Sequence, residues 1–140
     1  MRDRYRVFRE VATRWMDNDV YGHVNNVVYY SYFDTVINAH LVAERALDPR
    51  DGAVIGLCVE SGCRYHAPLS FPEVIDAGLV VAKLGTTSVR YELALFRPGE
   101  SAPVAEGHFV HVFVDRETRR PTPIQGSLRA TLAALMVASG

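Results

Sequence analysis

One stretch of the chain has the hydrophobic period of a helix, and four later stretches have the period of a strand. From residue 25 to residue 47, apolar side chains recur at steps of three and four positions, as on one face of a helix. Beyond Gly52 the period becomes two. The predicted strands are residues 53–65, 74–84, 87–97 and 104–115, with glycines and prolines between them. This order of one helix and then four strands restricts the fold more than any other feature.

Two shorter elements are predicted near the ends of the chain. Residues 5–16 alternate as a first strand does, and residues 127–137 form a short helix. Consecutive strands joined by short turns pair antiparallel. One amphipathic helix set against such a sheet gives an α+β fold, with about five strands wrapped around the long helix. The 140 residues suit one domain, which spans residues 1–140.

The composition is that of an ordinary globular protein. Hydrophobic residues make up 49% of the chain, charged residues make up 22%, and the net charge is −1. A chain so close to neutral gives no sign of a nucleic-acid partner. Its first residues lack the apolar stretch of a signal peptide, and no apolar run is long enough to span a bilayer. We therefore expect a cytoplasmic protein without an integral membrane segment.

The two cysteines, Cys58 and Cys63, lie in one predicted strand. Their odd separation would place them on opposite faces of the sheet. We therefore expect no disulfide between them, which agrees with a reducing compartment. No second pair of Cys or His residues stands at metal-ligand spacing, so no metal is expected.

The segment before the long helix is rich in polar residues. Residues 17–26 read Asp-Asn-Asp-Val-Tyr-Gly-His-Val-Asn-Asn, which holds too many turn-forming residues for a regular element. A helix start presents free backbone N–H groups and a partial positive charge, and both stabilise an anion. A carboxylate beside such donors has two parts of an acyl-transfer site, a base or nucleophile and an oxyanion hole. Helix capping by Asn25 or Asn26 explains the same residues equally well.

The same segment resembles the signature of the 4-hydroxybenzoyl-CoA thioesterase-like hotdog family. The shared pattern is an aspartate, three residues, His-Val-Asn-Asn and then a tyrosine, and here its members are Asp19, His23, Val24, Asn25, Asn26 and Tyr29. Looser similarities extend over nearly the whole chain, at residues 64–68, 84–88, 114–115 and 118–121. The resemblance implies a hotdog fold and an enzyme that hydrolyses an acyl- or aroyl-CoA thioester to the free acid and coenzyme A.

The resemblance also implies roles for two groups in this loop. Asp19 corresponds to the catalytic carboxylate, which acts as a general base or as a nucleophile. The backbone N–H of Asn26 corresponds to the donor that polarises the thioester carbonyl. For His23 two roles stay open, because a histidine here either orients water or bonds the backbone as a structural residue. Asp17 is expected to be a solvated neighbour in the turn.

Further candidates concern the substrate. Tyr29 follows Asn26 by one helical turn and is the best pocket candidate, and Asn25 belongs to the same motif. Coenzyme A is part of the substrate, so no separate cofactor is expected. The candidates for contact with its pantetheine or phosphates are Ser88, Arg90, Arg119 and Arg120. The histidines expected to be packing or surface residues, without an acid partner, are His66, His108 and His111.

Two other functions fit a hotdog chain. A hotdog hydratase or dehydratase also places Asp and His near a helix start, but its usual loop has Asn-Pro before the His and one more residue between Asp and His. This chain has Tyr21-Gly22 before His23, which disfavours hydration. A non-catalytic acyl-CoA-binding module has no need for a carboxylate opposite the donor N–H, so Asp19 argues against it.

The predicted architecture leaves strand edges open. Open edges favour pairing with another chain, and Phe109 and Phe113 need cover on one face of the sheet or the other. The resemblance points the same way, because protomers of the family pair edge to edge and hold acyl-CoA between subunits. We therefore expect a homodimer or homotetramer in which the Asp19 loop lies against the partner's strands.

Overall fold

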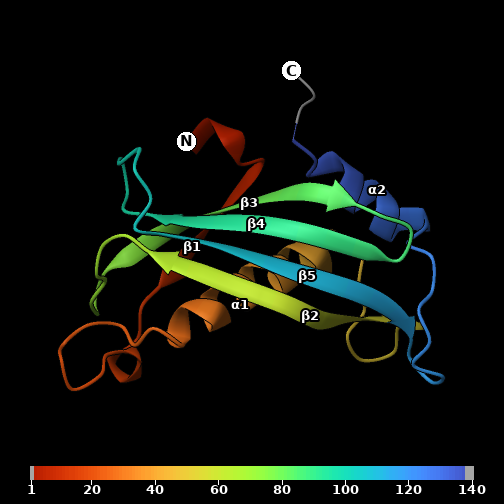
Figure 1. Ribbon diagram of the computed structural model, residues 1–140, viewed down its shortest axis with the longest axis horizontal. Coiled ribbons are helices and arrows are strands. Elements are labelled where there is room, and N and C mark those ends of the chain that lie inside the picture. Colours follow the sequence, from red (N-terminus) through yellow and green to blue (C-terminus); the bar gives the residue numbers. More distant parts are fainter. Residues whose placement is uncertain (1, 138–140) are drawn as a thin grey trace.

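Five antiparallel strands form one sheet in the computed structural model, which describes residues 2–137 (Figure 1). The order across the sheet is β1-β3-β4-β5-β2. The predicted succession of strand, helix and four strands is confirmed. In chain order the elements are the 3-10 helix η1 (Arg2–Arg4), β1 (Val7–Ala12), the 3-10 helix η2 (Trp15–Asp17), α1 (Val28–Ala43), β2 (Val54–Tyr65), β3 (Val74–Leu84), β4 (Ser88–Phe96), β5 (Ala105–Asp115) and α2 (Gly126–Ala134).

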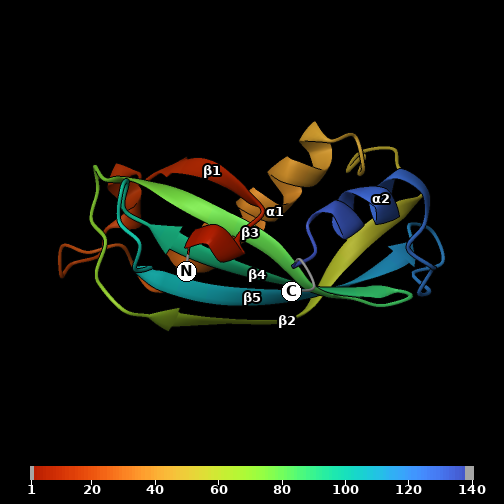
Figure 2. The same cartoon turned by 90° about the horizontal axis from the view of Figure 1, so that it is seen from above.

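The long helix α1 lies against one face of the sheet (Figures 1 and 2). Phe33 and Ile37 of this helix are fully buried in the main core. Leu132 of the short helix α2 is buried in the same core. This arrangement is the predicted hotdog fold, in which a sheet packs on one long helix. The β4 side chains that point into this core at alternate positions are Val89, Tyr91, Leu93 and Leu95.

A smaller apolar cluster lies on the opposite face of the sheet, here called the outer face. Tyr5 packs there with Val80, Ala94 and Phe96, and all four side chains are buried. The guanidinium of Arg2 lies 4.8 Å from the centroid of the Phe96 ring. The N-terminal segment therefore folds over the outer face and covers part of it. Ala94, which alternation alone places on the polar face of β4, is buried for this reason.

The first strand is shorter than residues 5–16. It pairs with β3 from Val7 to Ala12, and Ala12 lies opposite Val74, the first residue of β3. Within residues 2–137, no strand therefore pairs with residues 13–16, although the alternation of apolar and polar residues continues through them. Thr13 leaves the sheet with its N–H donating to the carbonyl of Glu73 at 3.1 Å.

The long helix begins later than a cap at Asn25 or Asn26 predicts. Val27 is the residue before its first turn, and no side chain caps that turn. Asn25 acts one step earlier, because its Oδ1 accepts the N–H of Val27 at 3.1 Å. The helix ends at Ala43, slightly before the predicted residues 45–47.

The two cysteines lie on the same face of β2, so the prediction from their odd spacing is wrong. β2 has a bulge at Val59, and the extra residue changes the alternation. Cys58 therefore lies opposite His111 and Cys63 opposite Gly107, at positions of β5 that share a face. Both thiols are free. Five residues of extended chain separate them by about 16 Å, which is beyond the reach of a disulfide.

Strands β1 and β2 form the two edges of the sheet. β2 is the longer edge, with 12 residues against 6 in β1, and within the described residues no strand covers its free side. Phe109 and Phe113 have the predicted cover on one face of the sheet, but it comes from the main core of the protomer itself. Among residues 2–137, no helix has the length and apolar character needed to cross a membrane.

Candidate functional site

The polar loop folds into a tight turn with Asp19 at its start. The N–H of Asp19 donates to the carbonyl of His23 at 2.9 Å, and the N–H of Gly22 donates to the carbonyl of Asp19 at 3.0 Å. Gly22 has a φ of +84°, a conformation that glycine adopts without strain. The Asp19 Oδ1 accepts the N–H of Tyr21 at 2.9 Å. The turn therefore orients the carboxylate while leaving the side chain partly exposed.

The side chain of Asn25 connects this carboxylate to the start of α1. Its Nδ2 lies 3.4 Å from Oδ2 of Asp19, and its Oδ1 accepts the N–H of Val27 at 3.1 Å. The carbonyl of Asn25 accepts the N–H of Val28 at 2.9 Å. The structure thus places Asn25, predicted as a substrate-binding residue, between Asp19 and the helix start.

The backbone N–H groups of residues 25–28 differ in whether they are bonded. The N–H of Asn25 donates to the carbonyl of Asp17 at 2.9 Å, and the donors of Val27 and Val28 are taken by Asn25. Within residues 2–137, no acceptor is bonded to the N–H of Asn26. Since backbone donors in folded proteins are normally paired, this amide is the one of these four that remains available to a ligand.

A cavity of about 300 Å³ opens beside this amide. The ring of Tyr29 is buried and meets the ring of Tyr65 edge-on, with centroids 4.9 Å apart. Three predicted site residues, His23, Asn26 and Tyr29, therefore meet at one cavity. Asp19 is not in its wall, but its N–H donates to the carbonyl of the wall residue His23. The residues of the wall are His23, Val24, Asn26, Tyr29, Tyr65, His66, Ala67 and Pro68.

Two residues of this wall, Tyr65 and His66, were not among the predicted site residues. Tyr65 ends β2, and its hydroxyl donates to the carbonyl of Asn26 at 2.8 Å, across 39 positions of sequence. The pair Arg64-Tyr65 belongs to the family resemblance, and this was the available signal. Only the folded chain brings the end of β2 to the helix start.

Two of the three histidines in and next to the strands have acid partners, contrary to prediction. His66 Nε2 lies 2.8 Å from Glu106, and His108 Nε2 lies 2.8 Å from Glu60. Each pair joins residues about 40 or more positions apart, so spacing in the sequence could not show it. His111 is a buried packing residue, as expected, with its ring 5.3 Å from that of Tyr91.

Asp17 is a buried structural residue and not the solvated neighbour that was predicted. Its side chain is 1% exposed and accepts the hydroxyl of Tyr32 at 2.6 Å. It also accepts the backbone N–H and the guanidinium of Arg14. Burial by itself would raise the pKa of Asp17, but the hydrogen bonds from Arg14 and Tyr32 outweigh it and lower the pKa. Asp17 therefore fastens the loop to α1.

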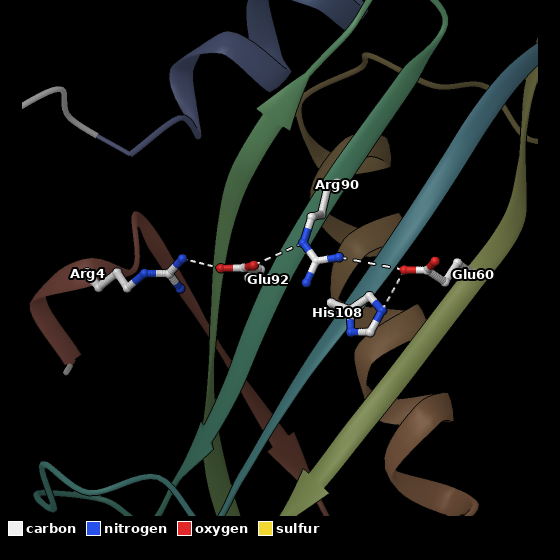
Figure 3. Close-up of polar contacts among 5 residues, drawn as sticks. All are labelled: Arg4, Glu60, Arg90, Glu92 and His108. Atoms are coloured by element: carbon white, nitrogen blue, oxygen red, sulfur yellow. Dashed lines mark hydrogen bonds and ion pairs between the residues drawn. The ribbon is translucent and has the colours of Figure 1, made fainter.

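Ser88 and Arg90 do not lie at this cavity within one protomer. β4 begins with Ser88 at the end of the sheet next to α2 (Figure 1). Arg90 lies on the outer face, where it bonds Glu92 at 3.0 Å and lies 3.6 Å from Glu60 (Figure 3). Arg4 binds the same Glu92 from the N-terminal segment. The other two candidates for contact with coenzyme A lie in the turn after β5, and they are Arg119 and Arg120.

The fold and the site together define a hotdog enzyme with a carboxylate and a free amide at the start of its long helix. A model of the thioesterase-like superfamily matches residues 13–132. The chain therefore belongs to the thioesterase-like superfamily, and it is a thioester hydrolase. The predicted hotdog thioesterase family is thereby confirmed, while the 4-hydroxybenzoyl-CoA type stays a prediction. No match was found among curated proteins.

Solved structures agree with this family over almost the whole chain. The PA5185 protein of Pseudomonas aeruginosa is 52% identical, with a TM-score of 0.96, covering 99% of this chain and 97% of that one. Slr0204, a 1,4-dihydroxy-2-naphthoyl-CoA thioesterase from Synechocystis, is 14% identical with a TM-score of 0.81, covering 90% and 94%. The BH1999 gentisyl-coenzyme A thioesterase is 22% identical with a TM-score of 0.79, covering 90% and 99%. At such low identity these last two likenesses show the fold alone.

Proposed function

We propose that this chain is an acyl-CoA thioesterase that uses the carboxylate of Asp19 and the backbone N–H of Asn26. The observation that carries the proposal is the Asn26 amide, which has no partner among the described residues and follows Asn25, whose side chain contacts Asp19 and accepts the N–H of Val27. Oδ2 of Asp19 lies 3.4 Å from Nδ2 of Asn25, which is a long distance for a hydrogen bond. Such a contact is weak, so this oxygen is the one free to act on water or substrate.

In the proposed reaction the thioester carbonyl oxygen accepts the N–H of Asn26. The positive end of the α1 dipole then stabilises the oxyanion that forms. Asp19 either removes a proton from the attacking water or attacks the carbonyl carbon itself, giving a mixed anhydride that water hydrolyses. On both routes the carbon–sulfur bond breaks, the thiolate of coenzyme A leaves and takes up a proton, and the carboxylic acid is released.

His23 fits the role of orienting water better than that of a structural histidine. Its side chain is exposed and lies in the wall of the cavity. Among the described residues its ring bonds no backbone group, while its own carbonyl accepts the N–H of Asp19. We therefore propose that the His23 ring acts on solvent in the site and that the chemistry does not depend on it.

A homodimer formed through the free edge of β2 is also proposed. This edge is long, and Val59 on it is 60% exposed. Apolar side chains around the Asp19 loop are exposed as well, with Trp15 at 81% and Val20 at 94%. A partner's strands would cover both regions and place the site at the subunit boundary. Ser88 and Arg90 remain candidates for coenzyme A contact only in a site shared between subunits, and a homotetramer would be built from two such dimers.

The proposal is tested by measuring thiol release from a panel of acyl-CoA substrates. The panel spans short, medium and long chains and includes aroyl-CoA esters, because the two neighbours named for a substrate act on aroyl-CoA. We expect release of coenzyme A from at least one member. Hydration of an enoyl-CoA without thiol release from any member would instead identify a hydratase.

A further inference from the structure

The hydroxyl of Tyr65 joins the last residue of β2 to the residue that carries the proposed oxyanion donor. It donates to the carbonyl of Asn26 at 2.8 Å. This carbonyl lies outside α1, because the first intrahelical acceptor is the carbonyl of Val27 at the cap position. No other donor among residues 2–137 bonds the Asn26 carbonyl. Tyr65 therefore supplies the one bond that this carbonyl makes within the protein.

The Asn26 N–H lies in the peptide plane before its Cα atom, and the Asn26 carbonyl lies in the plane after it. The plane before it is held because the carbonyl of Asn25 accepts the N–H of Val28 at 2.9 Å. The plane after it is held by Val27 N–H, which donates to Asn25 Oδ1, and by Tyr65, which bonds the carbonyl. Without the Tyr65 bond, this second plane loses its anchor on the sheet side. Because the two planes are hinged at the Asn26 Cα atom, motion of the second plane would let the Asn26 N–H sample a wider range of directions.

Tyr65 is itself well placed to act as a fixed donor. Its ring meets that of the buried Tyr29 at 4.9 Å, which limits its rotation. Burial raises the pKa of the Tyr65 hydroxyl, and the neighbouring Cys63 and Tyr30 raise it further. The hydroxyl therefore keeps its proton and can donate throughout the neutral and mildly alkaline range.

We propose that Tyr65 is a positioning residue for this enzyme, which aims the Asn26 amide at the oxyanion by holding the Asn26 carbonyl. The inference rests on the proposed function of that amide. It differs from a binding role, in which Tyr65 would contact the substrate in the cavity. It also differs from a role in the stability of the fold. The bond is exposed at the end of the sheet, where its loss should change the free energy of unfolding little.

The test compares Tyr65→Phe with Tyr91→Phe in the full chain. Tyr91→Phe is the matched control, because it also removes one tyrosine hydroxyl, and that hydroxyl has no partner among the described residues. We expect Tyr65→Phe to lower kcat about tenfold, the scale of one lost hydrogen bond, with KM within about twofold and an unchanged Tm. Tyr91→Phe should leave kcat and KM unchanged. An unchanged kcat in Tyr65→Phe, or a raised KM with kcat retained, overturns the proposal.

A second readout does not depend on turnover. Amide hydrogen exchange, followed by NMR, should become about tenfold faster at Val27 and Val28 in Tyr65→Phe, because local opening becomes easier. Exchange at Val80, in the middle of β3, serves as the internal reference and should not change. Unchanged exchange at both sites near the helix start overturns the positioning role. If the wild-type protein releases no thiol from any acyl-CoA, the proposed function fails and this role fails with it. Exchange then reports only whether Tyr65 holds Asn26.

Discussion

The hydroxyl of Tyr32, on the buried face of α1, donates a hydrogen bond of 2.6 Å to Asp17, two positions before the proposed catalytic Asp19. This bond fastens the loop of residues 17–26 to α1, the helix that follows the loop. Arg14 bonds the same carboxylate from the other side. Loops are generally mobile, so one buried anchor this close to Asp19 limits how far the carboxylate can move from the Asn26 amide.

Removing the charge of this anchor should destabilise the protein. Asp17→Asn keeps an acceptor for Tyr32 but loses the charge that pairs with Arg14. We expect the free energy of unfolding to fall by about 2 kcal/mol, the scale of a hydrogen bond to a charged group. Urea denaturation at pH 7 measures it. Asp51→Asn is the control, since Asp51 is exposed and its carboxylate has no partner among the described residues, and it should leave stability unchanged.

The same carboxylate should make stability depend on pH. The pKa of Asp17 in the folded protein lies below its ordinary value of 3.8. Its contribution is therefore complete above that ordinary pKa and is lost as the pH falls through the folded-state pKa. The stability difference between wild type and Asp17→Asn should be constant from pH 7 to about pH 5 and shrink below about pH 4. A difference that grows on acidification would contradict the assigned bonds.

Asp19→Asn should abolish most of the activity without unfolding the chain. We expect kcat to fall by about a hundredfold or more, the scale of a lost general base, and further if Asp19 is the nucleophile. The fold should survive, because an asparagine oxygen can accept the N–H of Tyr21 as Asp19 does. Asp17→Asn should cost much less activity per folded molecule. An inactive Asp17→Asn beside an active Asp19→Asn would show that the assignment is wrong.

The proposed dimer should depend on the edge of β2. Val59→Lys places a charge on this edge and should shift the protein toward monomers with lower activity. Val42→Lys is the control, since Val42 is also exposed but lies on α1. Sedimentation across a dilution series, with activity measured at each concentration, follows both variants. A wild-type monomer that keeps full turnover on dilution would exclude the dimer and the shared site.

Tyr91→Phe should be neutral or stabilising. The ring of Tyr91 is fully buried, and its hydroxyl has no hydrogen-bond partner among the described residues. A buried polar group without a partner costs free energy, so its removal should change the free energy of unfolding by between zero and about +1 kcal/mol. Thermal and urea unfolding measure this. A loss of more than about 1 kcal/mol would mean that the hydroxyl is bonded, for example to a buried water.

The sequence by itself determined the elements and the loop. Helical and strand periods depend on neighbours a few positions apart, so α1 and strands β2 to β5 could be predicted closely. The run from Asp19 to Tyr29 is local as well, and it was enough to predict the family and to name Asp19, His23 and Asn26 together. Turn chemistry between adjacent residues, such as glycine at position 22, is visible in the chain itself.

Only the tertiary structure decided which distant residues meet. Tyr65 reaches Asn26 across 39 positions, and Glu92 holds Arg4 and Arg90 on the outer face. Periodicity predicts which face of a sheet a side chain lies on, but it does not predict the residue opposite on the next strand or where that strand ends. The early end of β1 and the bulge in β2 were therefore missed. Burial of Asp17 was missed for the same reason, because an aspartate at the start of a turn-rich segment is normally solvated unless the fold brings groups such as Tyr32 and Arg14 around it.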